Sequence, residues 1–112
     1  MEIESTDSVA STEAVEGVHL HLLAAGENAN LQGFEIEPGA SVPEHDHPHE
    51  QLGVVVEGTL TFLVDGEEHA VGPGDTYRLA GGEPHAAENW GDVTVVGYDV
   101  FSPPRDDPDW QE

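Results

Sequence analysis

The sequence has no cysteine and no lysine, and its only basic side chains besides histidine are Arg78 and Arg105. Without cysteine the chain can form no disulfide and has no thiolate to serve as a nucleophile or metal ligand. The Gly-x-Ser-x-Gly pattern of many serine hydrolases is also missing. Neither cysteine nor serine hydrolysis is therefore supported.

Positive charge is scarce, because two arginines face 24 Asp and Glu residues and the formal net charge is −22. Such a chain repels nucleic-acid phosphates and anionic membrane surfaces, so we expect neither as a partner. The acidic residues are scattered through patterned apolar segments, which argues against a disordered, chelating protein. Self-repulsion of this size is tolerable where molar salt shortens the Debye length to roughly 3 Å. We therefore expect a protein from a halophile.

Long apolar runs are missing too, since none approaches the roughly 20 residues of a membrane-spanning helix. The first residues, 1–4, lack the basic and apolar regions of a signal peptide, so we expect a cytoplasmic protein. A length of 112 residues allows one domain with one modest core.

Short apolar segments with strand-like alternation recur along the chain. The predicted strands are 18–23, 31–37, 52–56, 59–64, 67–71, 75–79, 85–90 and 93–101. Asp65-Gly66 lies between two of them and predicts a type I′ hairpin, which needs positive φ at both turn residues. Turns at about eight- to ten-residue intervals, with no helix-period segment, predict an all-β barrel or jelly roll in a single domain.

The ends of the chain are predicted to lie outside this barrel. Residues 1–16 are polar and acidic and should form a flexible arm, with at most a helical turn at 12–16. The barrel is expected to span 17–105, followed by an acidic tail at 106–112.

Several aromatic and imidazole side chains are expected to have structural and not catalytic roles. His19 and His21 alternate with leucines and are expected on the wet face of an outer strand; a second ligand pair is the alternative, although no third ligand is spaced to join them. Phe62, Tyr77 and Trp90 are predicted to pack in the barrel, and His69 to be a solvated hairpin residue.

Three histidines and a carboxamide fall within the segment 43–51. His45 and His47 are two residues apart and share one side of an extended segment, while a bend at Pro48 can bring Gln51 back toward them. His85 lies far along the chain, between two predicted strands. Three nitrogens and one oxygen suit a divalent transition metal with open positions. The alternative is solvated loop histidines, but a barrel can bring distant strand ends to one mouth.

These residues resemble two motifs of the cupin family. The first is matched by Gly39, His45, His47, Gln51 and Gly58, with Gln51 where many members have Glu. The second is matched by Gly74, Ala80, Gly81, Gly82, His85 and Asn89, with Ala80 at a proline position. The resemblance covers roughly 31–105 and implies a small, single-domain cupin jelly-roll β-barrel. It also implies that His45, His47, Gln51 and His85 bind one metal ion, which could be nickel, zinc, manganese, iron or cobalt.

The glutamine changes the expected electrostatics of the site. Three neutral imidazoles and a neutral amide leave the charge of a divalent ion uncompensated, so the site should attract an anion and polarise its oxygens. A small carboxylate is the expected partner. The Ala80 departure affects only the rigidity of one turn.

The last strand adds a further resemblance. Asp99, Phe101 and Arg105 are spaced as in the small cupins that open unsaturated uronates released from pectin and alginate. This implies a 4,5-unsaturated monouronate as substrate, Asp99 as general acid or base, Arg105 as partner of the substrate carboxylate and Phe101 as an apolar wall. Without the resemblance, Asp99 would be an outer-face residue and Arg105 a surface ion-pair partner.

Other functions remain open at this level. A cupin oxygenase would need a redox-active metal and an apolar pocket, and a non-catalytic sugar- or metal-binding module would keep the site without turnover. His49 is expected beside the ligands rather than among them, because His45, His47 and Gln51 already fill the matched positions. Small cupins commonly pair, so a homodimer is expected.

The charge predicts a salt requirement. Lowering NaCl from molar to about 0.1 M lengthens the Debye length to about 10 Å, so repulsion should loosen or unfold the protein. The measurement is the melting temperature by circular dichroism across a salt series. A melting temperature that does not change with salt would contradict the assignment to a halophile.

Overall fold

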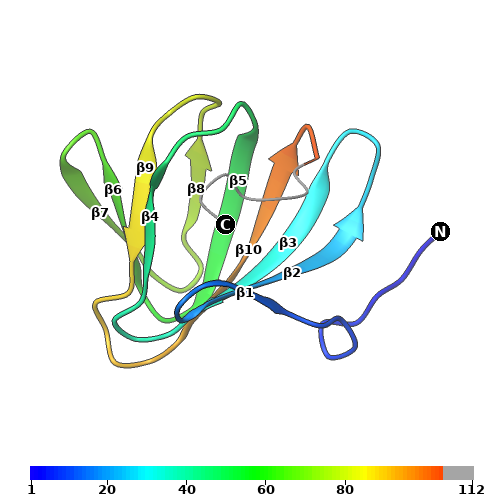
Figure 1. Ribbon diagram of the computed structural model, residues 1–112, viewed down its shortest axis with the longest axis horizontal. Coiled ribbons are helices and arrows are strands. Elements are labelled where there is room, and N and C mark those ends of the chain that lie inside the picture. The colour runs from blue at the N-terminus through cyan, green and yellow to red at the C-terminus, as the bar shows by residue number, and fades with distance from the viewer. Residues whose placement is uncertain (105–112) are drawn as a thin grey trace.

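The computed structural model describes residues 1–104, which form ten strands in two sheets (Figure 1). One sheet has six strands in the order β1-β2-β3-β10-β5-β8, and the other has four in the order β4-β9-β6-β7. The strands are β1 (Thr12–Val15), β2 (Val18–Ala25), β3 (Asn30–Ile36), β4 (Ser41–His45), β5 (Glu50–Glu57), β6 (Leu60–Val64), β7 (Glu67–Val71), β8 (Thr76–Leu79), β9 (His85–Glu88) and β10 (Val95–Ser102). Within residues 1–104, no helix is long and apolar enough to cross a membrane.

The predicted all-β, single-domain jelly roll is confirmed, and each predicted strand is present with ends shifted by a few residues. Two strands were missed. The helical turn expected at 12–16 is wrong, because Thr12–Val15 forms β1 and pairs antiparallel with β2. Val15 packs against the core, which draws part of the expected arm into the sheet. Strand β4 contains Pro43 and polar residues, so it shows no clear alternation.

The hairpin between β6 and β7 has the predicted geometry. Asp65 has φ 52° and Gly66 has φ 77°, and Val64 pairs with Glu67 across the turn. Positive φ at both central residues matches the type I′ turn that joins two twisted strands. His69 lies on β7 with a side chain that is 53% exposed, as predicted.

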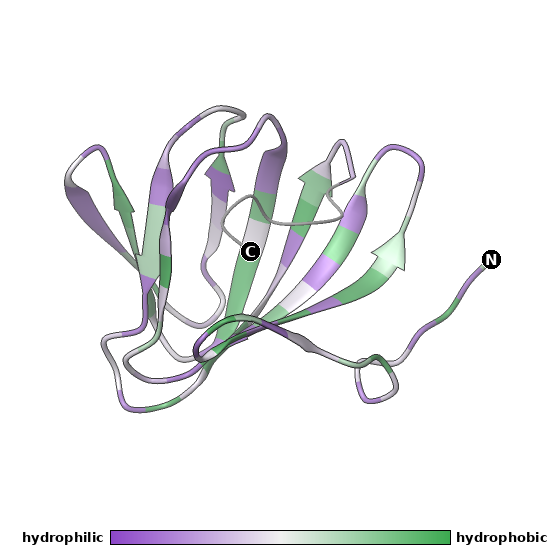
Figure 2. Ribbon diagram, viewed as in Figure 1, coloured by the Kyte–Doolittle hydropathy of each residue, from purple (hydrophilic) through white to green (hydrophobic). Residues whose placement is uncertain are grey.

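The core lies between the two sheets. In Figure 2 the hydrophobic bands lie mainly on the strands. The buried cluster takes residues from both sheets: Val18, Phe34, Ile36, Val55, Leu60, Phe62, Val71, Leu79, Ala87 and Val95. Trp90, predicted to pack there, is 56% exposed and donates its indole N–H to Glu88 at 2.6 Å. The prediction fails because β9 ends at Glu88, before the tryptophan.

The inward-facing residues of β10 include both apolar residues and the polar Asp99. Its burial pattern alternates, with Val95, Gly97, Asp99 and Phe101 buried and the residues between them less so. The strand is paired on both sides, by β3 and by β5. Asp99 and Phe101 therefore point between the sheets from the middle of the six-stranded sheet.

Asn89 ties two distant parts of the chain together. Its side chain is 1% exposed, and its amide nitrogen donates to the Ile36 carbonyl at 2.9 Å and to the Val93 carbonyl at 2.8 Å. Its amide oxygen accepts the Gly91 N–H at 2.9 Å. The loop after β9 is thereby held to the end of β3.

This network predicts a stability loss for Asn89→Ala of about 2–4 kcal/mol, because two carbonyls and one N–H lose their partner in a buried setting. Denaturant unfolding at constant high salt measures the loss. Asn28→Ala is the matched control, since this exposed residue contributes only its backbone carbonyl to Ser102. Equal stability of the two variants would contradict the assigned role.

Candidate functional site

Antiparallel pairing of β4 with β9 brings two of the expected ligands together. His45 is the register partner of His85, and His47 follows directly after β4. One ring nitrogen from each of the three lies within 4.8 Å of the others. His47 is 2% and His85 3% exposed, while His45 is half-buried. The fold thus gathers three imidazoles whose sequence positions differ by up to forty residues.

Backbone carbonyls set the tautomer of all three rings. The Nδ1 contacts are His45 to Pro43 O at 2.9 Å, His47 to His49 O at 3.0 Å and His85 to Glu83 O at 2.8 Å. A carbonyl oxygen can only accept, so each neutral ring carries its proton on Nδ1 and its lone pair on Nε2. Neutral imidazole held in this way is the form that ligates metals.

The glycine turn before β9 supports the loop that carries His47. Gly82 donates its N–H to the His47 carbonyl at 2.7 Å, and a Cβ at Gly81 would come within 2.6 Å of the Pro48 carbonyl oxygen. The Ala80 N–H donates to the Glu83 carboxylate at 3.0 Å. A proline at position 80 has no N–H to make this bond, so the alanine changes how the turn is closed.

Gln51 completes the set from β5. Its side chain is buried, and its Oε1 lies 3.2 Å from the Nε2 of His47. With the His47 proton on Nδ1, the Gln51 Oε1 and the His47 Nε2 point lone pairs at each other and repel. A cation bound by both atoms would remove this repulsion. The residues therefore fit a divalent metal ion held by three imidazole nitrogens and one amide oxygen.

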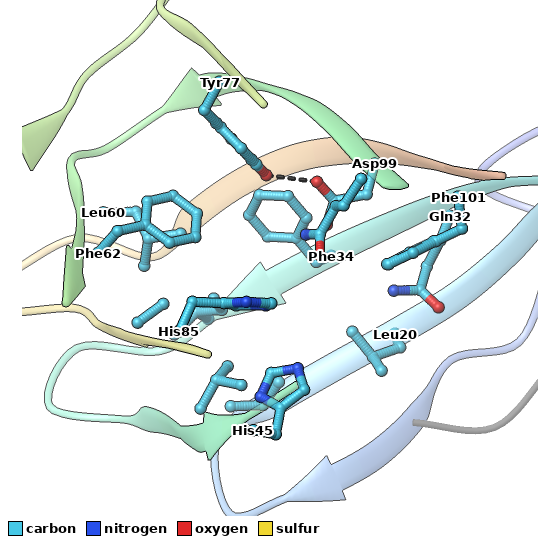
Figure 3. Close-up of a pocket in the computed structure, with 15 residues that line it drawn as sticks. Leu20, Gln32, Phe34, His45, Leu60, Phe62, Tyr77, His85, Asp99 and Phe101 are labelled. Atoms are coloured by element: carbon cyan, nitrogen blue, oxygen red, sulfur yellow. Dashed lines mark hydrogen bonds between the residues drawn. The ribbon is translucent and has the colours of Figure 1, made fainter. Parts of the chain in front are cut away.

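His45, His85 and Gln51 line a pocket between the two sheets. Its lining is mainly apolar and includes Leu20, Phe34, Ile36, Val42, Leu60, Phe62 and Phe101, together with the polar Gln32, His45, Gln51, Tyr77, His85 and Asp99. In Figure 3, His45 and His85 lie on one side, and Tyr77 and Asp99 meet on the opposite side. A few polar groups converging in an apolar pocket are typical of small-molecule sites.

Asp99 is buried in this pocket, at 6% exposure, and accepts a hydrogen bond from the Tyr77 hydroxyl. Burial raises the pKa of Tyr77, and the Asp99 charge and hydrogen bond raise it further, while the nearby Gln51 amide acts in the opposite direction. Tyr77 therefore keeps its proton at neutral pH. The structure places Asp99 on the inner face of the sheet. The alternative prediction, an outer-face position, is therefore wrong.

Tyr77 and Gln32 are polar pocket residues that were not predicted from the sequence. The Tyr77 ring does pack, with its centroid 4.6 Å from that of Phe62, but its hydroxyl reaches Asp99. The sequence contained one sign of this contact. Gly53 lies within a predicted strand, and a strand glycine often marks a place where another group approaches the backbone closely.

Of the other expected site residues, Phe101 and His49 lie close to the histidine ligands. Phe101 is 2% exposed, and its ring centroid lies 5.7 Å from that of His47, edge to face. His49 lies beside the ligands, with its carbonyl on His47 and its ring 6.3 Å from Phe101. Arg105 lies outside the described residues.

His19 and His21 lie away from the pocket, on β2. The Nε2 of His19 is 2.6 Å from the Glu37 carboxylate, and Glu13 brings a third possible ligand atom within 4.8 Å. The expectation that no further ligand joins these histidines is therefore wrong for His19, because pairing of β1 with β2 places Glu13 opposite it. His21 lies 3.8 Å from the Glu35 carboxylate.

Comparison with known proteins places this geometry in a family. Residues 33–101 match the Cupin domain family. The chain is 33% identical over 101 residues to the tetracenomycin polyketide synthase protein TcmJ of Streptomyces glaucescens, covering 86% of this chain and 68% of TcmJ. It is 24% identical over 102 residues to the pectin degradation protein KdgF of Dickeya dadantii, covering 90% and 92% of the two chains.

A solved structure shares the whole fold. KdgF from Halomonas sp. superposes with a TM-score of 0.85 at 24% identity, over 95% of this chain and 96% of that one. The two-sheet architecture and the match over residues 33–101 agree with each other. The chain therefore belongs to the cupin domain family.

Proposed function

We propose that this protein is a metal-dependent enzyme that converts 4,5-unsaturated monouronates to their linear keto forms. The observation that carries the proposal is one pocket in which His45 and His85 of the four-stranded sheet face Gln51 and the buried Asp99 of the six-stranded sheet, with His47 beside the other two imidazoles. The likeness to two proteins named KdgF, one of them named for pectin degradation, supports the substrate class. The oxygen and nitrogen ligands suit nickel, zinc, manganese, iron or cobalt.

Substrate binding in this proposal depends on charge. The chain carries a net charge of −22, and among the described residues that line the pocket the charged one is Asp99, which repels an anion. A bound metal ion with neutral ligands would supply local positive charge and polarise the substrate oxygens. Phe101 would form an apolar wall beside the sugar ring, and Arg105 would pair with the carboxylate.

Ring opening is an isomerisation that moves one proton. The anomeric hydroxyl loses its proton and becomes the aldehyde, the bond from the anomeric carbon to the ring oxygen breaks, and that oxygen becomes an enolate. A proton then reaches the double-bond carbon remote from the carboxylate, which completes the ketone. Asp99 is the residue proposed to take or deliver this proton, because it is the acidic side chain in the pocket. Tyr77 would hold its carboxylate in place.

A second candidate is an enzyme acting on a polyketide. The specific observations are the largely apolar lining of the pocket and the 33% identity to TcmJ. Asp99 and the metal centre would serve proton transfer on a phenolic or keto substrate in the same positions. A cupin oxygenase or a binding module without turnover would use the same centre.

Metal binding is predicted to depend on the histidines of the site. His85→Ala should lose most bound metal, because it removes one ligand of four, whereas His69→Ala on the exposed hairpin should retain wild-type content. Elemental analysis of protein purified in high salt and loaded with Co²⁺ or Ni²⁺ gives the stoichiometry. Equal metal content in the two variants would contradict the proposed centre.

Ring opening is predicted to be visible as accelerated loss of ultraviolet absorbance from a freshly made unsaturated uronate, since the conjugated double bond disappears. Asp99→Asn should retain metal and lower the rate by about 10²–10⁴-fold, the usual contribution of a general acid or base. Asp92→Asn, in an exposed loop, is the matched control and should react at the wild-type rate.

The outcomes separate the candidate functions. Metal-loaded wild-type protein that does not exceed the spontaneous rate would overturn the uronate assignment. Changes in the absorbance of a polyketide on incubation with the same protein would then favour the second candidate. A wild-type rate in Asp99→Asn would show that another group moves the proton.

A further inference from the structure

Gln32 is a polar residue of the pocket to which the proposed reaction gives no role. It lies on β3, is half-buried and lines the pocket together with Phe34 and Ile36 of the same strand. Within residues 1–104, its side-chain amide forms no hydrogen bond with another protein group. The amide offers two N–H donors and one acceptor oxygen. It can therefore pair with a ligand group that both donates and accepts, as a hydroxyl does.

The register of the six-stranded sheet places Gln32 directly beside Asp99. Gln32 is the cross-strand partner of Asp99 on one side, and Gly53 is its partner on the other side, with Tyr77 next in the same row. Directly opposed residues project from the same face with their Cβ atoms about 4.5–5.5 Å apart. The Tyr77 hydroxyl reaches Asp99 across Gly53, so Asp99 lies between Tyr77 and Gln32 (Figure 3).

The other polar side chains that line the pocket already have roles. The histidines and Gln51 belong to the proposed metal centre, and Tyr77 donates its proton to Asp99, the residue proposed to act on the substrate. The remaining described side chains of the lining, apart from Gln32, are apolar. A sugar hydroxyl that leaves water for such a pocket loses affinity unless it finds a hydrogen-bond partner. Gln32 is the lining side chain that can supply one.

We propose that Gln32 is a specificity-determining residue, whose amide binds the substrate hydroxyl next to the carbon that receives the proton. This rests on the reaction advanced under Proposed function. In a 4,5-unsaturated monouronate that carbon is C4, and the neighbouring C3 carries a hydroxyl. When Asp99 faces C4, the residue beside it on the neighbouring strand faces the C3 hydroxyl.

This role narrows the class of substrate. A metal ion with neutral ligands attracts small carboxylates in general, so the centre by itself does not select sugars. An amide placed to pair with a hydroxyl discriminates against an analogue that lacks the hydroxyl, because the amide is then left unpaired. Gln32 would therefore select hydroxylated sugar acids among the small acids that the metal centre attracts.

The first test compares two unreactive ligands that differ by one hydroxyl. A 4-deoxyuronate keeps the C3 hydroxyl but has no double bond, and a 3,4-dideoxyuronate lacks that hydroxyl as well. Calorimetry with metal-loaded protein in high salt should show about 10-fold tighter binding of the 4-deoxyuronate to the wild type. Gln32→Met has a side chain of similar length without the amide, and should bind the two ligands within about threefold of each other. Absence of a preference in the wild type would overturn the proposal.

Two further variants control for general damage. Gln32→Asn keeps an amide but is one carbon shorter, so it should lose the preference while preserving the polarity of this wall. Glu35→Gln is the matched control, because Glu35 is exposed on the opposite face of the same strand and its variant should keep the wild-type preference. A preference retained in both Gln32 variants, or lost equally in Glu35→Gln, would overturn the role of Gln32.

Kinetics distinguish failure of this inference from failure of the proposed reaction. A hydroxyl bound equally in the ground and transition states affects KM, so Gln32→Met should raise KM for the unsaturated uronate about 10-fold and change kcat by less than about threefold. A preference that depends on Gln32, in protein that opens no ring, would overturn the reaction and leave the hydroxyl site. Ring opening with the same KM in wild type and Gln32→Met would overturn the hydroxyl site and leave the reaction.

Discussion

The position of β5 between β8 and β10 is the constraint on which the site depends. Its inward residues Gln51, Gly53 and Val55 supply in succession a polar group, an empty space and a core side chain. A shift of one residue in this register would turn all three outward and bring Leu52 and Val54 inside. Pairing on both sides holds the register, which is why a polar network can persist so close to the core.

The second sheet contributes the opposite wall of the site. Its edge strand β4 and neighbour β9 carry His45 and His85 as cross-strand partners, while His47 comes from the loop after β4. Each ring is fixed by a carbonyl two residues away in the chain. Local turns therefore set the ring tautomers, and the packing of the two sheets sets the distance from the histidines to Tyr77 and Asp99.

Charge and fold have separate roles in this protein. The net charge of −22 belongs to the whole chain and bears on solubility and salt response, whereas the pocket is mainly apolar with one buried carboxylate. A cupin fold carries many chemistries, so the family by itself leaves the reaction open. In this chain the pocket combines the neutral Gln51 with Asp99 and the Tyr77 hydroxyl that donates to it.

Much of the fold followed from local patterns. Alternation predicted most strands, Asp65-Gly66 predicted its turn, and the spacing of His45, His47, Gln51 and His85 singled out the residues that converge. Strands β1 and β4 were not predicted, because polar residues and Pro43 obscure their alternation. Both strands are stabilised by pairing with β2 and β9. Local sequence carries no record of such pairing.

Short-range periodicity was enough to predict an all-β chain, whereas the grouping of His85 with His45 and His47, up to forty residues away, rested on the resemblance to the two cupin motifs. The contact between Tyr77 and Asp99 was decided only in three dimensions, since it joins β8 to β10 across a glycine of a third strand. So was the orientation of the Gln51 amide, whose two ends are chemically different but similar in size. A hydrogen bond has a direction, and that direction exists only once its partners are in place.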